Sequence, residues 1–280
     1  MAPRVVLITG CTTGSIGYAL SEEFAAQGYT VYASSRRVET IAPSPTFPDS
    51  VKRIQLDVTD DESVARAVEE VVKEEGRIDV LVNNAGSLAA GALLDLEMEF
   101  VQKTLDLNTV SILRVSKAVV PHMAKRKTGL IVNVGSVVAQ HPGTAPTVPP
   151  KAAVHSLSQV LSMELKPLGI SVLHVAPGAI TSNLASNEAA RFTLPEDSLW
   201  SAYLPDMIRR INASQGKHSM PSEVFAEKVV RRVKGMERGS GEGRYGFFLL
   251  GGQAWLFKVL RWIPTAWLLK AMWKTYSKKA

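Results

Sequence analysis

The sequence predicts an α/β protein built on a doubly wound parallel sheet. Short runs of β-branched residues alternate with helical patterns through the first two thirds of the chain, which is typical of strand–helix–strand units. The strand-like runs are almost continuously apolar instead of alternating with polar residues. Continuous apolar runs indicate strands that are covered by helices on both faces, because such strands bury every side chain.

Each predicted element follows from its local pattern. The β-branched apolar runs predict strands at Val5–Ile8, Thr30–Ala33, Arg53–Leu56, Val80–Val82, Leu130–Val134 and Ser171–Val175. Apolar residues spaced three and four apart predict helices at Ile16–Gln27, Glu62–Glu75, Phe100–Arg126 and Ala152–Leu168. After Pro177-Gly178 the alternation stops, and residues 183–222 combine loops with short helical pieces, as expected of a lobe that covers a substrate. We expect residues 1–280 to form one domain.

Composition limits the classes of function. The chain has 280 residues, 46% of them apolar, which is enough for a large core. A single cysteine, Cys11, excludes an internal disulfide framework and suits a reducing, cytoplasmic compartment. The basic residues behind the net charge of +6 are scattered, with modest clusters at Lys125-Arg126-Lys127 and at the C-terminus, which argues against nucleic-acid binding. A basic balance also suits a phosphate-bearing cofactor or an anionic membrane surface. The five histidines show no metal-ligand spacing, so we expect no metal site.

The C-terminal segment, residues 247–280, is rich in aromatic side chains. Lys258, Arg261 and Pro264 interrupt it, so it lacks the ~20 uncharged residues of a membrane-spanning helix. The sequence allows two arrangements of this segment. The aromatic residues could pack on the body of the protein or on a second subunit of a homo-oligomer. Alternatively, the segment could form an interfacial helix in peripheral contact with an intracellular membrane.

The clearest motif follows the first strand and opens the first helix. It reads Thr9-Gly10-Cys-Thr-Thr-Gly14-Ser15-Ile16-Gly17. Glycines there permit a tight turn, the close approach of backbone to a pyrophosphate, and tight helix–strand packing. The amides and dipole of the helix N-terminus would then hold the phosphates. The motif in this context predicts a Rossmann-type dinucleotide-binding domain.

The end of the second strand distinguishes between NAD and NADP. An acidic residue at that point would accept a hydrogen bond from the ribose 2′-hydroxyl, but this chain has Ser34-Ser35-Arg36-Arg37. Two arginines suit a 2′-phosphate by charge and by their forked donor geometry. We therefore expect NADP(H) to be the cofactor.

Further motifs carry a family resemblance. Asp57-Val58 follows the third strand, Asn83-Asn84-Ala85-Gly86 follows the fourth, and Pro177-Gly178-Ala-Ile180-Thr-Ser182 follows the sixth. Together with the glycine turn they resemble the short-chain dehydrogenase/reductase family. The chain is most similar to the fungal branch related to 1-acyldihydroxyacetone-phosphate reductase, although the glycine turn is one residue shorter and has Ser15 where that branch has glycine.

The resemblance implies roles for individual residues. Cofactor contacts are expected from Gly10, Gly14, Ile16, Gly17, Arg36, Arg37, Asp57, Val58, Asn84, Ala85, Lys117, Lys151, Ile180 and Ser182. Ser136 would hold the substrate oxygen, and Lys151 would bind the nicotinamide ribose. Asn108 would anchor a proton relay. The implied activity is hydride transfer between NADP(H) and a small-molecule carbonyl/alcohol pair, or a C=C or C=N bond.

One catalytic position departs from the family pattern. Four residues before Lys151, where the family has its acidic tyrosine, this chain has Thr147, followed by Pro149 and Pro150. An aliphatic hydroxyl is a far weaker acid than a phenol, whose reference pKa is about 10. Because proline is tolerated in the first helical turn but not in the interior, we expect the helix to begin near these prolines, which leaves Thr147 outside it.

Several replacements for the acid remain open. Candidate proton donors are His141, His155, Tyr203 and Lys151 itself, the last if desolvation lowers its pKa. The scaffold could also have been redirected to a non-redox reaction such as isomerisation, dehydration or cyclisation. A catalytically silent protein that binds a cofactor or partner is a third possibility, since function resides in the site and not in the fold.

Overall fold

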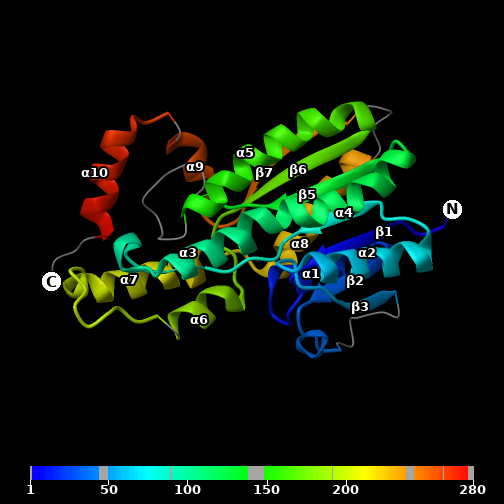
Figure 1. Cartoon of the computed structure of the whole chain (residues 1–280). Helices are drawn as coiled ribbons and strands as arrows, with labels where there is room; N and C mark the ends of the chain where they lie inside the picture. The colour runs from blue at the N-terminus through cyan, green and yellow to red at the C-terminus, as the bar shows by residue number, and fades with distance from the viewer. Residues whose placement is uncertain are drawn as a thin grey trace.

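A computed structural model of the chain describes residues 2–43, 50–88, 90–137, 148–190, 192–237, 243–260 and 262–276. In these residues a seven-stranded sheet has the order β3-β2-β1-β4-β5-β6-β7, and every neighbouring pair is parallel (Figure 1). The strands are β1 Val5–Thr9, β2 Thr30–Ser35, β3 Val51–Gln55, β4 Val80–Asn83, β5 Gly129–Val134, β6 Ile170–Pro177 and β7 Tyr245–Leu250. The predicted doubly wound α/β class is confirmed.

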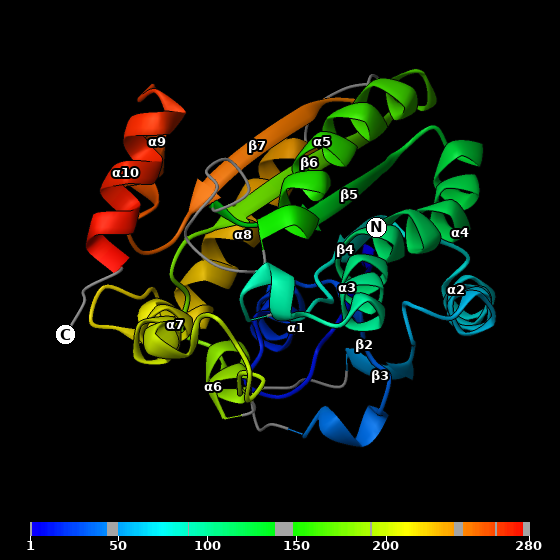
Figure 2. The same ribbon diagram turned by 60° about the vertical axis from the view of Figure 1, so that its left-hand side comes forward.

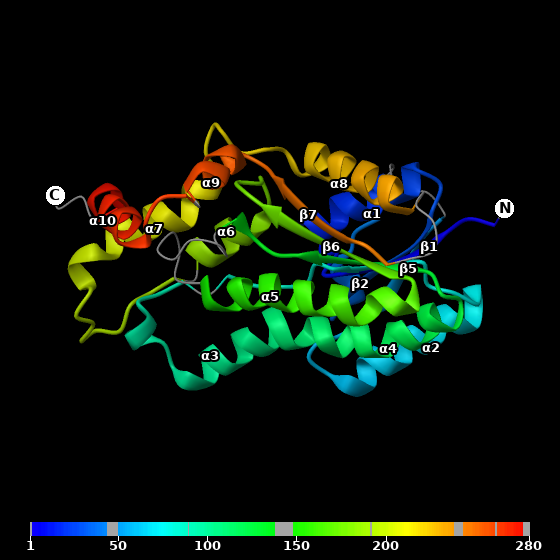
Figure 3. The ribbon, with the colours of Figure 1, turned by 90° about the horizontal axis from the view of Figure 1, so that it is seen from above.

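Helices cover both faces of the sheet and create two hydrophobic cores. On one face, α1 (Ile16–Ala26) and α8 (Ser222–Glu237) lie side by side, and on the other lie α2 (Asp61–Glu75), α4 (Ser111–Lys125) and α5 (Val148–Leu165) (Figure 3). Side chains of a central strand alternate between the cores, so Val6 and Ile8 join the first and Val5 and Leu7 the second. Burial on both faces explains why the strands are continuously apolar in sequence.

The long helix predicted at Phe100–Arg126 is interrupted. Helix α3 (Met98–Leu105) continues into a π-helical turn at Asp106–Val110, and α4 follows at Ser111. Hydrophobic spacing cannot show such a turn, because one extra residue barely changes the pattern of apolar positions. The π-turn contains Asn108, and π-turns of this kind occur frequently at functional sites.

The region after β6 contributes short helices and one strand that was not predicted. Helices α6 (Asn183–Ala189) and α7 (Leu204–Ile211) form a lobe beside the sheet, as expected for residues 183–222 (Figure 2). The start of the aromatic segment expected at residues 247–280 belongs to the unpredicted strand, since Tyr245–Leu250 forms β7 and pairs with β6. Helices α9 (Ala254–Leu260) and α10 (Thr265–Tyr276) follow. No helix within the described ranges is long and apolar enough to cross a membrane.

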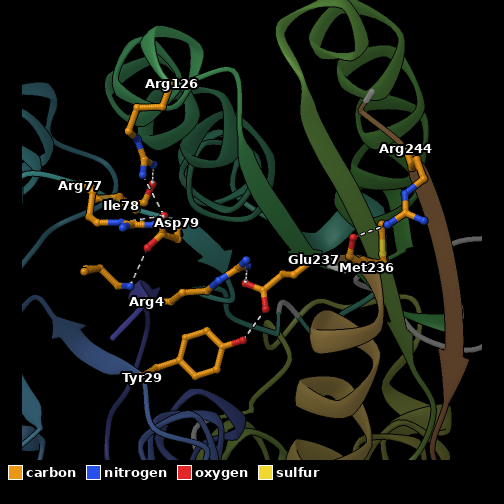
Figure 4. Close-up of polar contacts among 10 residues, drawn as sticks. Arg4, Tyr29, Arg77, Ile78, Asp79, Arg126, Met236, Glu237 and Arg244 are labelled. Atoms are coloured by element: carbon orange, nitrogen blue, oxygen red, sulfur yellow. Dashed lines mark hydrogen bonds and ion pairs between the residues drawn. The ribbon is translucent and has the colours of Figure 1, made fainter. Parts of the chain in front are cut away.

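The amino ends of the strands carry two clusters of paired charges (Figure 4). Directly before β4, Asp79 accepts hydrogen bonds from Arg77 at 2.6 Å and from Arg126 and the Val5 amide at 2.9 Å each. Burial opposes ionisation of Asp79, but these donors outweigh it and hold the pKa of the carboxyl below its usual range. Beside it, Glu237 of α8 pairs with Arg4 at 2.8 Å and accepts a hydrogen bond from the Tyr29 hydroxyl.

Candidate active site

A cavity of about 580 Å³ lies at the opposite edge of the sheet, where the strands end. Its walls come from the residues that follow β1, β2, β4, β5 and β6, together with the first turns of α1 and α5 and parts of the lobe. The sheet order reverses between β1 and β4, and ligands of open α/β sheets bind in the crevice at such a switch point. The cavity is therefore the candidate active site.

The turn after β1 has the shape expected of a phosphate cradle. Gly10 has φ +74°, a conformation that side chains disfavour, and a Cβ at Gly17 would lie 2.5 Å from the Gly10 carbonyl oxygen. Ser15 caps α1: its hydroxyl accepts a hydrogen bond from the Tyr18 amide and donates one to the Gly10 carbonyl, both at 3.1 Å. Gly10, Ser15 and Ile16 line the cavity, whereas Gly14 and Gly17 shape the turn behind it. A helix N-terminus that opens into a cavity suits a pyrophosphate.

The two arginines after β2 are placed differently. Arg36 lines the cavity. The Arg37 side chain is exposed, and it is not part of the wall. At the end of β3, Val58 lines the cavity, while the carboxylate of Asp57 accepts hydrogen bonds from the amide and hydroxyl of Thr59 at 2.9 and 2.7 Å.

Asn84 and Ala85 line the cavity after β4 and also hold the glycine turn in place. The Asn84 side-chain amide donates to the carbonyls of Thr9 and Gly10 at 2.9 and 3.1 Å. The Thr9 hydroxyl accepts hydrogen bonds from the backbone amides of Asn84 and Ala85, at 3.0 Å each. Asn84 therefore fixes the distance between the two strand ends that form this wall.

Three of the four predicted catalytic residues open onto the same cavity. Ser136 follows β5, Lys151 lies in the first turns of α5, and Asn108 lies in the π-turn. A Cβ at Gly86 would lie 2.7 Å from Asn108 Oδ1 and 3.4 Å from Lys151 Nζ, so both polar groups surround this glycine. Asn108 Oδ1 also accepts a hydrogen bond from the Ser87 amide at 3.2 Å. The fourth residue, Thr147, lies outside the described residues.

Lys151 is held by a carbonyl and not by a carboxylate. Its Nζ donates a hydrogen bond to the Val134 carbonyl at 3.1 Å, and no acidic side chain of the described residues pairs with it. Desolvation disfavours the charged ammonium and lowers the pKa of Lys151 to about 8. The prediction that α5 begins near the two prolines is confirmed, since the helix starts at Val148.

Of the other candidate proton donors, those among the described residues do not line the cavity. His155 lies behind Lys151 on α5, where its Nδ1 is 3.1 Å from Nδ1 of the buried His174 and its ring packs on Phe247. Tyr203 stacks against Trp273 of α10, with ring centroids 5.6 Å apart, and is not part of the wall. His141 lies outside the described residues, and Lys117 is exposed on α4 and not part of the wall.

The segment after β6 closes the cavity at its far end. Ile180 and Ser182, both expected to contact the cofactor, line the wall. Gln215 holds this segment in place, because its side-chain amide donates to the Ile180 carbonyl and its oxygen accepts from the Ser182 amide, both at 3.3 Å.

Several lining residues were not predicted from the sequence. Asn187 of α6, Arg210 of α7 and Gln253 before α9 all contribute to the wall. They belong to no recognised motif, so no sequence signal singled them out. A buried ladder beneath the site was also missed: Asn83 donates to Asn133 at 2.9 Å, and Asn133 donates to Ser158 at 3.1 Å. This ladder ties β4, β5 and α5 together under Lys151.

Known proteins support the same assignment. The sequence profile of the family described as short chain dehydrogenase matches residues 4–191. The NADPH-dependent 1-acyldihydroxyacetone phosphate reductase of Schizosaccharomyces pombe is 35% identical over 243 residues, which are 85% of this chain and 80% of that protein. The 3-ketodihydrosphingosine reductase of Bacteroides thetaiotaomicron is 35% identical over 189 residues, 67% of this chain and 68% of that protein.

A solved structure extends the similarity beyond the matched residues. The crystal structure of a short-chain dehydrogenase from Streptomyces avermitilis superimposes with a TM-score of 0.77 and 29% identity, covering 99% of this chain and 97% of that one. The fold, the position of the cavity and the similar proteins all indicate the same family. The chain belongs to the short-chain dehydrogenase family, whose members are NAD(P)-dependent oxidoreductases.

Proposed function

We propose that the protein is an NADP(H)-dependent oxidoreductase that acts on a small-molecule carbonyl/alcohol pair, or on a C=C or C=N bond. The observation that carries the proposal is the shared cavity of Arg36, Ser136, Lys151 and Asn108. Arg36 stands at one end of the strand edge, and the three polar groups stand at the other. This spacing suits an extended dinucleotide with its reactive ring beside the polar groups.

The lining residues fit the cofactor at both ends. The amides at the start of α1 and the Gly10 turn would hold the pyrophosphate, and Arg36 would pair with the 2′-phosphate. Ile180 and Ser182 would hold the carboxamide, and Lys151 the nicotinamide ribose. When bound, NADP(H) supplies or accepts the hydride, and the protein positions it.

We propose that Lys151 also supplies the proton that Thr147 cannot. A general acid works best when its pKa is near the operating pH, and desolvation brings the pKa of Lys151 to about 8. Ser136 would hold the substrate oxygen by donating its hydroxyl hydrogen. Asn108, in the π-turn beside Gly86, would keep the neighbouring polar groups oriented so that Lys151 is reprotonated from solvent.

A second function is favoured by one observation, the threonine at position 147. General acid–base action is typically worth ~10²–10⁴ in rate, so its loss would suit a reaction that needs no phenolic acid. Isomerisation, dehydration or cyclisation would use Ser136 and Lys151 as polarising groups, with the cofactor shaping the pocket. The third alternative is a protein that binds the cofactor but catalyses no reaction.

The stoichiometry of the reaction separates these functions. Purified protein is incubated with NADPH and a panel of carbonyl, imine and enone compounds, and product and nicotinamide absorbance are measured together. One NADPH consumed per product supports the oxidoreductase. Product formed at constant absorbance would instead support the non-redox function, and NADPH binding without any product would support the silent protein.

We also infer that the protein works in the cytoplasm, as a homo-oligomer and in peripheral contact with an intracellular membrane. The support for membrane contact is the C-terminal pair of helices, whose tryptophans lie on the surface. The single cysteine, Cys11, is buried and free, which suits a reducing compartment.

A further inference from the structure

The helices α9 and α10 expose an unusual set of side chains. Trp255, Trp262, Trp267 and Trp273 are 69%, 79%, 75% and 62% exposed. These are four of the five tryptophans in the chain. Large apolar side chains gathered on one exposed segment mark an interaction surface, because isolated soluble domains rarely leave such area in water. We name residues 254–276 the aromatic platform.

The aromatic platform is attached to the body at defined points. Leu268 of α10 and Ala254 of α9 are buried, so each helix has an inward side. Trp273 packs on Tyr203 next to the lobe helix α7. Figures 1 and 2 show both helices at the end of the molecule where α7 lies. The exposed tryptophans therefore sit on a folded support while most of their side-chain area stays exposed.

The net positive charge of the protein is concentrated in residues 243–280, which include the aromatic platform and its four basic residues, Lys258, Arg261, Lys270 and Lys274. Residues 243–280 contain seven of the 32 Lys and Arg residues and none of the 26 Asp and Glu residues. The remaining residues balance to −1, so the whole net charge of +6 comes from this segment. On α10, Trp267, Lys270 and Lys274 follow one another at spacings of three and four, which places them on one helix face, and all three are exposed.

We infer that the aromatic platform docks on an anionic lipid surface. Tryptophan prefers the headgroup level of a bilayer, and lysines on the same face reach anionic headgroups, each worth about 1 kcal/mol near the surface. A second copy of this chain fits the surface less well, because a symmetric interface would place these positive charges against one another. The inference deepens the proposed peripheral contact by naming the lipid chemistry and the residues.

Docking at this point would bring the cavity to the lipid surface. Gln253 lines the cavity and is followed directly by α9, while Arg210 and Ile211 of α7 line it from the lobe that touches α10. The platform thus continues the wall of the cavity. An apolar or amphiphilic substrate dissolved in the membrane could enter without crossing water, which makes lipid-dissolved compounds the favoured substrate class.

The test is vesicle flotation with the full-length protein. Vesicles of phosphatidylcholine alone are compared with vesicles that also contain phosphatidylserine, at low and high salt. We expect binding to the anionic vesicles, weaker binding at high salt, and a blue shift of tryptophan emission on binding. Protein that stays unbound from anionic vesicles at low salt would overturn the inference.

Matched variants identify the residues responsible. Trp262→Ala with Trp267→Ala should weaken binding about tenfold or more, and Lys270→Glu with Lys274→Glu by at least roughly 30-fold. Two controls change exposed side chains of the same kind elsewhere. They are the apolar pair Val160→Ala with Met163→Ala on α5, and the basic pair Lys125→Glu with Lys228→Glu on α4 and α8. If the controls weaken binding as much as the platform variants do, the platform is not the docking surface.

Two further measurements keep the outcomes distinct. If size-exclusion chromatography shows a dimer that the tryptophan variants dissociate, and vesicles are not bound, the platform belongs to a second copy and the inference is wrong. NADPH binding by calorimetry should be the same in every variant. If the unmodified protein does not bind NADPH, the proposed function is rejected, but the vesicle result still stands.

Discussion

At the amino ends of the strands, Asp79 receives hydrogen bonds from two arginines and a backbone amide, whereas at the carboxyl ends Lys151 donates to the single carbonyl of Val134. The pKa of each group follows from its partners. Its donors hold the pKa of Asp79 below the usual carboxyl range, so this charge is stabilised. Desolvation brings the pKa of Lys151 to about 8, so this charge is destabilised.

The contrast separates stability from function within one sheet. A paired buried charge holds elements together, as Asp79 does for β1, β4 and the end of α4. A buried charge without a charged partner, such as the Lys151 ammonium, lowers the free energy of unfolding. Such a charge is typical of a site where a proton is transferred near neutral pH. Changes at the amino edge should therefore alter unfolding and spare catalysis, and changes at the carboxyl edge should do the reverse.

The largest effect is expected from Lys151→Ala. The variant removes the group that would bind the nicotinamide ribose and supply the proton, so kcat should fall by ~10²–10⁴. The midpoint of urea unfolding should stay the same or rise, because a buried cation is lost. Lys151→Arg serves as the control that keeps the charge. Full activity in Lys151→Ala would end the proposed role of this residue.

Asp79→Ala tests the opposite edge. Removing the carboxylate leaves Arg77 and Arg126 without their buried partner, which should lower the free energy of unfolding by about 3 kcal/mol. In the unmodified protein the same contribution is present above the ordinary carboxyl pKa of 3.8 and is lost as the pH falls below it, because the folded-state pKa is lowered. Urea unfolding at several pH values measures both effects. If kcat of the folded Asp79→Ala variant also falls, the amino edge contributes to catalysis and the contrast between the two edges does not hold.

The pH dependence of the reaction tests the role of Lys151 at the carboxyl edge more closely. If Lys151 donates the proton during reduction, kcat should be constant below about pH 8 and fall about tenfold per unit above it. Lys151→Arg should lower kcat and remove the fall near pH 8, since a guanidinium stays protonated and is a poor proton donor. Stability should rise across the same range, from about pH 8 towards the ordinary lysine pKa of 10.5, as the buried cation loses its proton. A profile that Lys151→Arg leaves unchanged would assign the proton to another group.

The smallest effect concerns the two arginines after β2. Because Arg36 lines the cavity and Arg37 does not, Arg36→Ala should weaken NADPH binding about tenfold and Arg37→Ala by much less. Binding of NADH should change little in either variant, and calorimetry with both cofactors measures the difference. Equal affinity for NADPH and NADH in the unmodified protein would contradict the NADP(H) proposal.

Much of the carboxyl edge could be predicted from sequence because its chemistry is local. The glycine turn after β1 needs glycine at Gly10 for its positive φ, and strand ends place Arg36, Asn84 and Ser136 by position alone. The exposed Lys117 and the carboxylate of Asp57, engaged with Thr59, show the limit of the same reasoning. A motif places a backbone position at an edge, but neighbouring side chains decide what faces the cavity.

The sequence by itself determined the alternation of strands and helices, the family motifs, and the presence of a threonine four residues before Lys151, since each is a matter of residue type and spacing. Only the tertiary structure decided the rest. Packing of α5 against β6 beside the end of β5 desolvates Lys151, and a π-turn aims Asn108 at Gly86. Folding also brings Arg210 and Gln253 to the wall and leaves the tryptophans of α9 and α10 on the surface. These properties depend on which distant segments meet, and burial between such segments has no local signature in the chain.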